Sequence, residues 1–305
     1  MSALKSNMLL LLAAAIWGVA FVAQRVGMEH VGPFTFNGVR FALGGLSLLP
    51  LIFYYRNKPQ QVPAGGSKCV IRAGFLAGLI LFTAASLQQI GLIYTTAGKA
   101  AFITCLYIVL VPTLGIFLKH YVSMTTWMSS VLAVIGLYLL CVKESFSISY
   151  GDLLELVGAL FWAAHILLID YFASRMDVLK LSFCQIITCA VLSMITALWF
   201  ETITIEGLTQ ALIPILYGGI CSVGIAYTLQ VVGQKYSPPS HAAIILSMET
   251  VFATVGGFLI LDERLGAQEL VGCALMLSGM LLTQLQSMQS AVPVNAVEEP
   301  DGKAG

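Results

Sequence analysis

Long apolar runs restrict the fold of this chain more than any other feature. Ten segments, each about 20 residues long, are nearly free of charged side chains, and this is the length that crosses a bilayer core as a helix. Only 10% of the residues are charged, against about 25% in a soluble domain. Backbone groups in lipid must be paired within the chain, and a helix pairs them within one segment. We therefore predict an all-α membrane protein with ten transmembrane helices. The predicted spans lie near residues 7–24, 33–55, 73–94, 98–118, 126–142, 151–172, 179–200, 209–233, 239–261 and 266–285.

The positions of lysine and arginine predict the orientation of these helices. With the N-terminus inside, the cytoplasmic segments contain ten of these residues and the outer segments four, while Arg40 lies within a span. Because cytoplasmic loops are enriched in Lys and Arg, we expect both termini in the cytoplasm and a multi-pass protein of the inner or plasma membrane. The formal net charge is zero, which gives no indication of nucleic-acid binding.

The chain contains an internal repeat. "LQQIGLIY" begins at Leu87 and "LQVVGQKY" at Leu229; over the 32 positions from Ser86, nine residues are identical at a constant offset of 142. Trp17 and Trp162 pair at an offset of 145. We predict a first five-helix repeat over 1–145 and a second over 146–290. Residues 291–305 form a short polar tail that we expect to be disordered.

Five helices per repeat place the second copy upside down relative to the first. Inverted repeats recur in secondary transporters, which hold their substrate near the membrane midplane between the two halves. Gln88 and Gln230 occupy equivalent positions. A buried amide needs hydrogen-bond partners, and a hydrated central cavity or a substrate can supply them. We therefore predict that both glutamines approach a shared cavity.

Several motifs resemble those of EamA-type transporters of the drug/metabolite transporter superfamily. They are "YTTAGKAAFITCLYIVLVPTLG" from Tyr94, "RF" at Arg40 and "MET" at Met248. The resemblance covers about residues 7–286. It implies a ten-helix inverted-repeat fold that moves small metabolites or drugs, commonly outward, and a cavity lined by the first, third, fourth, sixth, eighth and ninth helices.

Two ionisable residues within spans are candidate functional groups, because such residues are costly in a membrane. Glu249 lies near the middle of its span and would exchange a proton from the cavity; the alternative is a structural carboxyl bonded to a neighbouring helix. His165 follows Trp162 on one helical face. It either lines the cavity, where it would titrate near neutral pH, or is a satisfied core residue.

Aromatic and polar side chains complete the candidate site. Trp17, Trp162 and Tyr227 would line a cavity for an amphipathic organic ligand, or they pack between helices. Arg40 would neutralise an anion, pair with a carboxylate, or extend towards the lipid headgroups. Pro112 is expected to kink the fourth helix, because it lacks the amide hydrogen.

The leading interpretation is a secondary transporter that exports small organic metabolites such as amino acids by alternating access. A multidrug or organic-cation exporter is the alternative within that class; a membrane-embedded receptor or a lipid-handling protein is the alternative outside it. The sequence contains no nucleotide-binding loop, metal-ligand set or nucleophile–base pair. We therefore expect no enzymatic activity, metal or cofactor. The expected partners are a small-molecule substrate, protons and the lipid bilayer.

Overall fold

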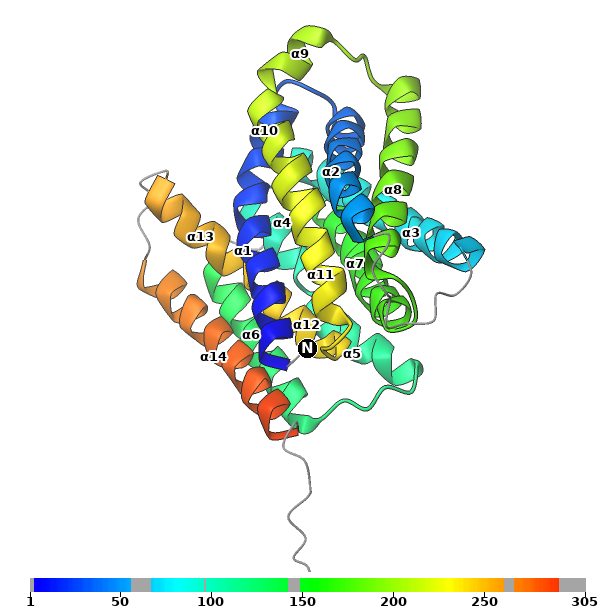
Figure 1. Ribbon diagram of the computed structural model, residues 1–305. Helices are drawn as coiled ribbons and strands as arrows, with labels where there is room; N and C mark the ends of the chain where they lie inside the picture. The colour runs from blue at the N-terminus through cyan, green and yellow to red at the C-terminus, as the bar shows by residue number, and fades with distance from the viewer. Residues whose placement is uncertain (1–2, 56–66, 96, 142–148, 261–265, 291–305) are drawn as a thin grey trace, which may run out of the picture.

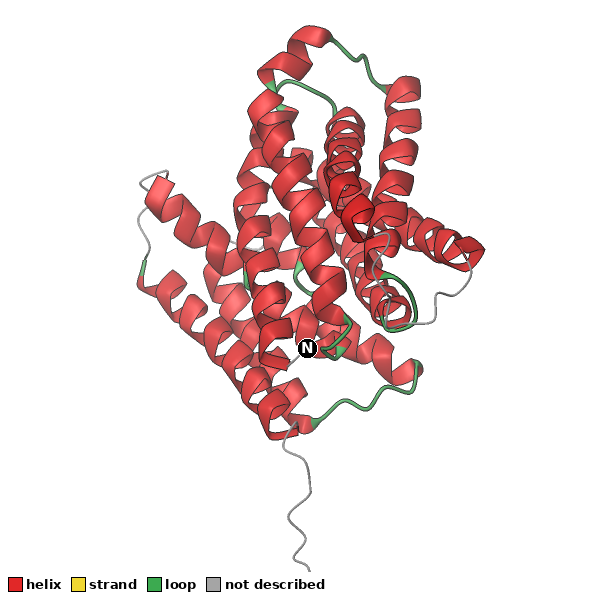
Figure 2. Cartoon of the chain, in the orientation of Figure 1, coloured by secondary structure: helices red, strands yellow, loops and turns green. Residues whose placement is uncertain are grey.

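The computed structural model describes residues 3–55, 67–95, 97–141, 149–260 and 266–290, within which every regular element is a helix (Figure 2). The predicted tail and the predicted boundary between the repeats lie outside these residues. The α-helices are α1 (Ala3–Met28), α2 (Pro33–Tyr55), α3 (Ser67–Tyr94), α4 (Ala97–Thr104), α5 (Tyr107–Phe117), α6 (Met124–Cys141), α7 (Tyr150–Ala173), α8 (Val178–Phe200), α9 (Ile205–Gln210), α10 (Leu212–Leu216), α11 (Tyr227–Gln234), α12 (Pro239–Leu246), α13 (Glu249–Ile260) and α14 (Ala267–Ser290), and η1 (Tyr217–Ala226) is a π-helix.

Seven helical stretches of the described chain are long and apolar enough to cross a membrane, and Met124–Leu139 and Ala267–Thr283 are shorter apolar helices. Each predicted span coincides with one helix or with a series of consecutive helices. The fourth span comprises α4 and α5, the eighth runs from α9 to α11, and the ninth comprises α12 and α13. The helical architecture is therefore as expected, while the count of ten spans stays a prediction.

The fourth and ninth spans are interrupted at equivalent positions of the repeat. The first break falls at Cys105–Leu106 and the second at Ser247–Met248, 142 residues later. At both breaks the hydrogen bonding tightens from four residues to three: Leu106 N donates to Ile103 O (3.1 Å), and Met248 N donates to Ile245 O (3.2 Å). The same local distortion in both halves supports the repeat independently of sequence identity.

Pro112 does not cause the interruption of the fourth span. It is buried within α5, which continues through it. A proline leaves the carbonyl four residues earlier without its usual donor, here that of Ile108. Ser130 Oγ of α6 lies 3.5 Å from Ile108 O and donates to it. The neighbouring helix therefore compensates for the proline.

The end of α8 and the start of α2 lie at the same end of the helix bundle (Figure 1). At one end Glu201, just after α8, accepts hydrogen bonds from the Phe34 and Thr35 amides at the start of α2 (2.8 and 2.7 Å). This carboxylate satisfies amides that a helix N-terminus leaves without partners, and its charge suits the helix dipole. The predicted outer segments beside Phe34 and Glu201 are thereby held together.

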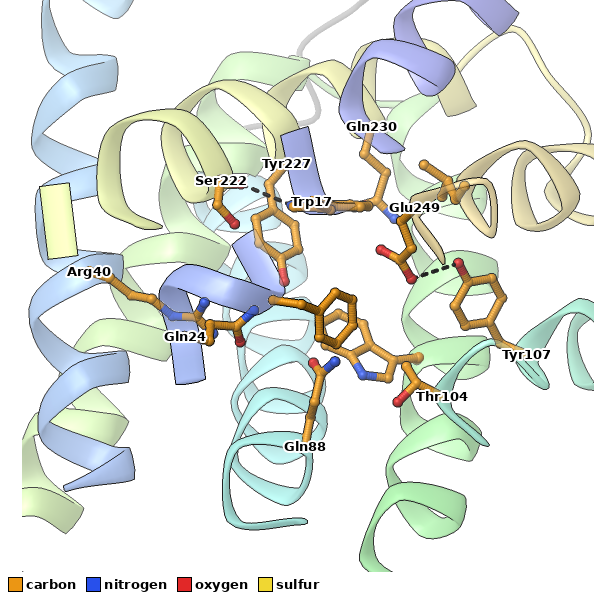
Figure 3. A pocket seen from close by; sticks show the side chains of 13 residues that line it. Trp17, Gln24, Arg40, Gln88, Thr104, Tyr107, Ser222, Tyr227, Gln230 and Glu249 are labelled. Atoms are coloured by element: carbon orange, nitrogen blue, oxygen red, sulfur yellow. Dashed lines mark hydrogen bonds between the residues drawn. The ribbon is translucent and has the colours of Figure 1, made fainter. Parts of the chain in front are cut away.

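Helix α1 crosses α13 at a glycine. A Cβ at Gly18 would lie 2.6 Å from Glu249 O and 2.8 Å from Ala253 N, far inside van der Waals contact. Small residues allow such close approach of transmembrane helices. Because α1 and α13 cross here, the side chains of Trp17 and Glu249 lie in the same central region (Figure 3).

Candidate functional site

A small cavity lies at the centre of the bundle, with a volume of ≈ 50 Å³. Its walls come from the predicted first, third, fourth, sixth, eighth and ninth spans, and also from the second span through Arg40. The lining residues are Trp17, Phe21, Gln24, Arg40, Gln88, Thr104, Tyr107, Trp162, Ser222, Tyr227, Gln230, Leu246 and Glu249. Six of the seven site residues predicted from the sequence are among them, and His165 is not.

Tyr227 is the centre of an aromatic wall. Its ring lies 4.9 Å from that of Trp17 and 6.4 Å from that of Trp162, measured between ring centroids. Trp17 Nε1 donates to the carbonyl oxygen of Ser222 in η1 (3.1 Å), whereas Trp162 Nε1 is buried without a hydrogen-bond partner among the described residues. The wall thus combines flat apolar surfaces with an unused N–H donor.

Three glutamine amides face the same cavity. Gln88 and Gln230 are 6% and 2% exposed, and Gln24 belongs to α1 together with Trp17. Gln24 Nε2 donates to Ala20 O (3.2 Å). Within the described chain, Gln24 Oε1 and Gln230 Oε1 are buried acceptors without a donor. Since unpaired buried polar atoms are costly, these oxygens favour a cavity that holds water or a polar ligand.

Glu249 is the first residue of α13, directly after the helix interruption. Its carboxylate oxygen Oε1 lies 3.3 Å from Tyr107 Oη and 3.4 Å from Cys105 Sγ, both of which donate to it. Figure 3 shows Glu249 and Tyr107 facing each other across the hydrogen bond. Tyr107 is itself the first residue of α5. The carboxyl group therefore lies where the two interrupted spans meet.

Arg40 is the single basic residue in this wall, and the sequence left its role open. The residue is 4% exposed, and its guanidinium lies over the rings of Phe36 and Phe41, at 5.3 and 5.1 Å from their centroids. Nε donates to Asn37 Oδ1 (3.0 Å). Arg40 therefore does not extend towards the headgroups as an interfacial arginine would.

Glu155 is a second buried carboxyl group, which the sequence reasoning missed. It is fully buried in α7, and Thr104 Oγ1 of the cavity wall donates to its Oε2 (2.8 Å). Oε1 has no hydrogen-bond partner in the described part of the chain. Glu155 lies one helical turn inside a predicted span boundary. A carboxyl group so far from the apolar centre of a span did not stand out in the sequence as a buried one.

His165 lies behind the aromatic wall instead of in it. It is fully buried, and its Nε2 forms a hydrogen bond with Gln185 Oε1 (2.9 Å). Its ring centroid lies 6.2 Å from that of Trp162 and 6.4 Å from that of Tyr227. The imidazole therefore contacts the rings that line the cavity and does not line it.

A larger recess of ≈ 590 Å³ lies at the end of the bundle that holds the first turn of α1. It is lined by segments that the charge bias assigns to the cytoplasm: Asn7, His120–Ser123, Asp170, Tyr236–His241 and Gln286. Helix α12 begins in this recess and reaches the central cavity at Leu246. The four residues between, Ala242–Ile245, are buried in one core cluster with Leu10 and Ile108, so an apolar layer separates the two spaces.

The described residues contain no group of three or more His, Cys, Asp or Glu side chains that would hold a metal ion. The cavity wall offers one cation, one carboxylate, three amides, the hydroxyls of Thr104, Ser222 and two tyrosines, and several aromatic rings.

Comparisons with known proteins agree with this architecture. An "Uncharacterized transporter" of Archaeoglobus fulgidus is 32% identical over 283 residues, 91% of this chain and 85% of that protein. The "Uncharacterized transporter YoaV" of Bacillus subtilis is 24% identical, over 88% of this chain and 92% of that protein. One crystal structure matches with a TM-score of 0.77 at 18% identity, covering 94% of this chain and 99% of that one, which shows a common fold.

The pattern of the EamA-like transporter family matches the chain twice, over residues 4–142 and 149–285. The two matches together cover most of the sequence, and they agree with the resemblance seen in its motifs. This chain is therefore a multi-pass membrane protein that belongs to the EamA-like transporter family.

Proposed function

We propose that this protein is a secondary transporter that exports small organic metabolites such as amino acids across the cell membrane by alternating access, with both termini in the cytoplasm. One observation carries the proposal: repeat-related positions of the two halves line the same central cavity. These pairs are Trp17 with Trp162, at an offset of 145, and Gln88 with Gln230, Thr104 with Leu246, and Tyr107 with Glu249, each at an offset of 142. Two inverted halves around one site supply the two equivalent gates that alternating access needs.

The larger recess lies where the proposed outward direction requires an entrance. The recess lies at the end that the charge bias assigns to the cytoplasm. A metabolite to be exported enters from that side. The apolar layer of α12 is then the barrier that it passes to reach the cavity.

Glu249 is the proposed coupling residue. Its carboxyl lies in the cavity wall and is 6% exposed. A carboxyl that reaches each membrane face in turn can load a proton on one side and release it on the other. The hydrogen bonds from Tyr107 and Cys105 orient its Oε1, and the rocking of the two halves would change its access.

A multidrug or organic-cation exporter, with Glu249 as the counter-charge, is the alternative transporter. Arg40 in the same wall weighs against it, because a guanidinium repels a cationic ligand in a site of low dielectric constant. A receptor or lipid-handling protein would bind ligands without moving them.

The test is flux through the purified chain in proteoliposomes. Metabolites that raise its melting temperature are identified first, since a ligand that binds the folded state stabilises it; amino acids form the first panel. We expect such a ligand to accumulate against its gradient when a pH gradient is imposed. Gln230→Ala should reduce this flux, whereas Ser278→Ala, at an exposed position of α14, should not. Binding without flux in either direction would favour the receptor.

A further inference from the structure

The guanidinium of Arg40 is buried with most of its hydrogen-bonding capacity unused. Nε is satisfied by Asn37 Oδ1, and Asn37 is in turn fixed because its Nδ2 donates to Ala85 O (3.3 Å). Within the described part of the chain, the N–H groups of the two terminal nitrogens donate no hydrogen bond, and no carboxylate lies within 4.0 Å of them. An arginine cannot give up its charge, so its cation remains in the wall of the cavity.

A buried charge without a partner is strongly destabilising, and ionisable residues in membrane proteins pair or mark a ligand pathway. The rings of Phe36 and Phe41 stabilise the cation in part, because aromatic faces attract cations. They leave the in-plane N–H groups free for an acceptor. The planar guanidinium fork matches a carboxylate, which it binds through two parallel hydrogen bonds.

The side chains around Arg40 indicate what the rest of a bound ligand would look like. Figure 3 shows Arg40 and Gln24 at one side of the cavity, with Glu249 and Tyr107 at the other. Between them are the rings of Trp17 and Tyr227, whose centroids are 4.9 Å apart. An anion at Arg40 would therefore present its apolar or aromatic body to this wall.

From this arrangement we propose that Arg40 is the substrate-anion site: the transported molecule carries a carboxylate that binds the guanidinium, and an aromatic or apolar body that packs on Trp17 and Tyr227. The proposal rests on the proposed transport function and narrows its substrate class to organic acids, zwitterionic ones included. It places a ligand-binding group in the second span, outside the six spans that the family resemblance implies as lining.

The experiment compares two probes that differ only in the acid group, phenylacetate and phenylacetamide. Binding to the purified full-length protein in detergent is followed by tryptophan fluorescence, since Trp17 and Trp162 line the cavity. Hydrogen bonds to a charged group contribute enough for a difference of about tenfold to a hundredfold in affinity. We expect phenylacetate to bind more tightly by that factor, and 2-phenylethylammonium to bind more weakly than either.

Three variants assign the preference to Arg40. Arg40→Gln should bind both probes with equal affinity, and Arg40→Lys, which keeps the charge and loses the fork, should retain part of the preference. Arg25→Gln is the matched control, because Arg25 lies next to Gln24 in α1 but is exposed and should retain the full preference. A melting curve establishes that each variant folds; the comparison of the two probes on the unchanged protein needs no variant at all.

The assignment would be overturned if phenylacetamide or the ammonium probe bound the unchanged protein as tightly as phenylacetate. A folded Arg40→Gln that keeps the preference for the acid would also overturn it. Absence of any phenylacetate binding would overturn it as well. These failures are distinct from failure of the transport proposal. Flux in proteoliposomes without acid selectivity keeps transport and removes the Arg40 site, while selective binding without flux does the opposite.

Discussion

Tyr107 and Glu249 are equivalent residues of the internal repeat, 142 positions apart, and they contact each other: Tyr107 Oη donates to Glu249 Oε1 over 3.3 Å. Two copies of one position touch only close to the axis that relates them. In the predicted inverted repeat, this contact would therefore lie close to the pseudo-two-fold axis, at the centre of the cavity. A transporter that rocks about this axis would keep the contact region in place while the helix ends move.

The first prediction concerns Glu249→Gln. The amide keeps the shape and an acceptor for the Tyr107 hydroxyl, but it cannot exchange a proton. We expect the variant to fold, to bind ligand and to exchange substrate for substrate, and to lose accumulation driven by a pH gradient. Counterflow and pH-driven uptake measured in the same vesicles separate these activities. Intact pH-driven accumulation would show that Glu249 does not couple transport.

The second prediction concerns access to the paired glutamines. A cysteine at Gln88 or at Gln230 should react with a small polar thiol reagent, because both side chains line the cavity, and bound substrate should slow the reaction. The background must lack the seven native cysteines. Cysteine at Leu137, which is fully buried in the core, is the control and should stay unlabelled. Lack of labelling at both glutamines in every transport state would place them in helix packing.

The third prediction concerns orientation. Arg175 and Glu201 flank α8, so reporters fused after them lie on opposite sides of the membrane. A fusion after Arg175 should report the cytoplasm and one after Glu201 the exterior, because the Lys and Arg bias places them so. A fusion after Lys235 serves as the cytoplasmic control. The reverse pattern would contradict both the orientation and the direction of export.

The fourth prediction concerns the stability contribution of Glu155. Glu155→Gln keeps a partner for Thr104 Oγ1 and introduces no charge, so stability should change by less than about 1 kcal/mol. Glu155→Ala leaves a buried hydroxyl unpaired and opens a cavity, which should cost about 2–4 kcal/mol. Glu206, exposed in α9, gives the matched pair of control variants, for which we expect changes within about 0.5 kcal/mol. Equal losses for the Gln and Ala variants of Glu155 would show that its charge is required.

The sequence predicted the positions of the helices and six of the thirteen residues that line the cavity, because run length and repeat offset are properties of the chain itself. The repeat offset of 142 residues also points to further residues of the cavity. Given Leu246 and Glu249, it points to Thr104 and Tyr107 in the first half, and all four line the cavity. Equivalent positions near a symmetry axis face one another, whatever their side chains.

The helix interruptions and the place of Arg40 could not be read from the sequence. The break at Cys105–Leu106 contains no proline or glycine, while Pro112, the expected breaker, lies in a continuous helix. Tertiary packing decides both, since Ser130 compensates for the proline. An arginine a third of the way into a span reaches either headgroups or cavity, and only the position of Asn37 and of the surrounding helices selects the cavity.

The two interruptions divide each of their spans into a half that ends at the cavity and a half that begins there. Helix α12 lies between the cavity and the recess on the predicted cytoplasmic side. Helix α4 is its equivalent in the predicted inverted repeat, which would place α4 on the opposite side. Three-residue hydrogen bonds replace the four-residue pattern at each break, as in Leu106 N to Ile103 O and Met248 N to Ile245 O, so each break is a point at which the short helix would change its angle to the longer helix beyond it. The protein would then have two equivalent short helices, one on each side of the central cavity. If one moved away while the other stayed in place, the cavity would open to one membrane face at a time and no continuous pore would form.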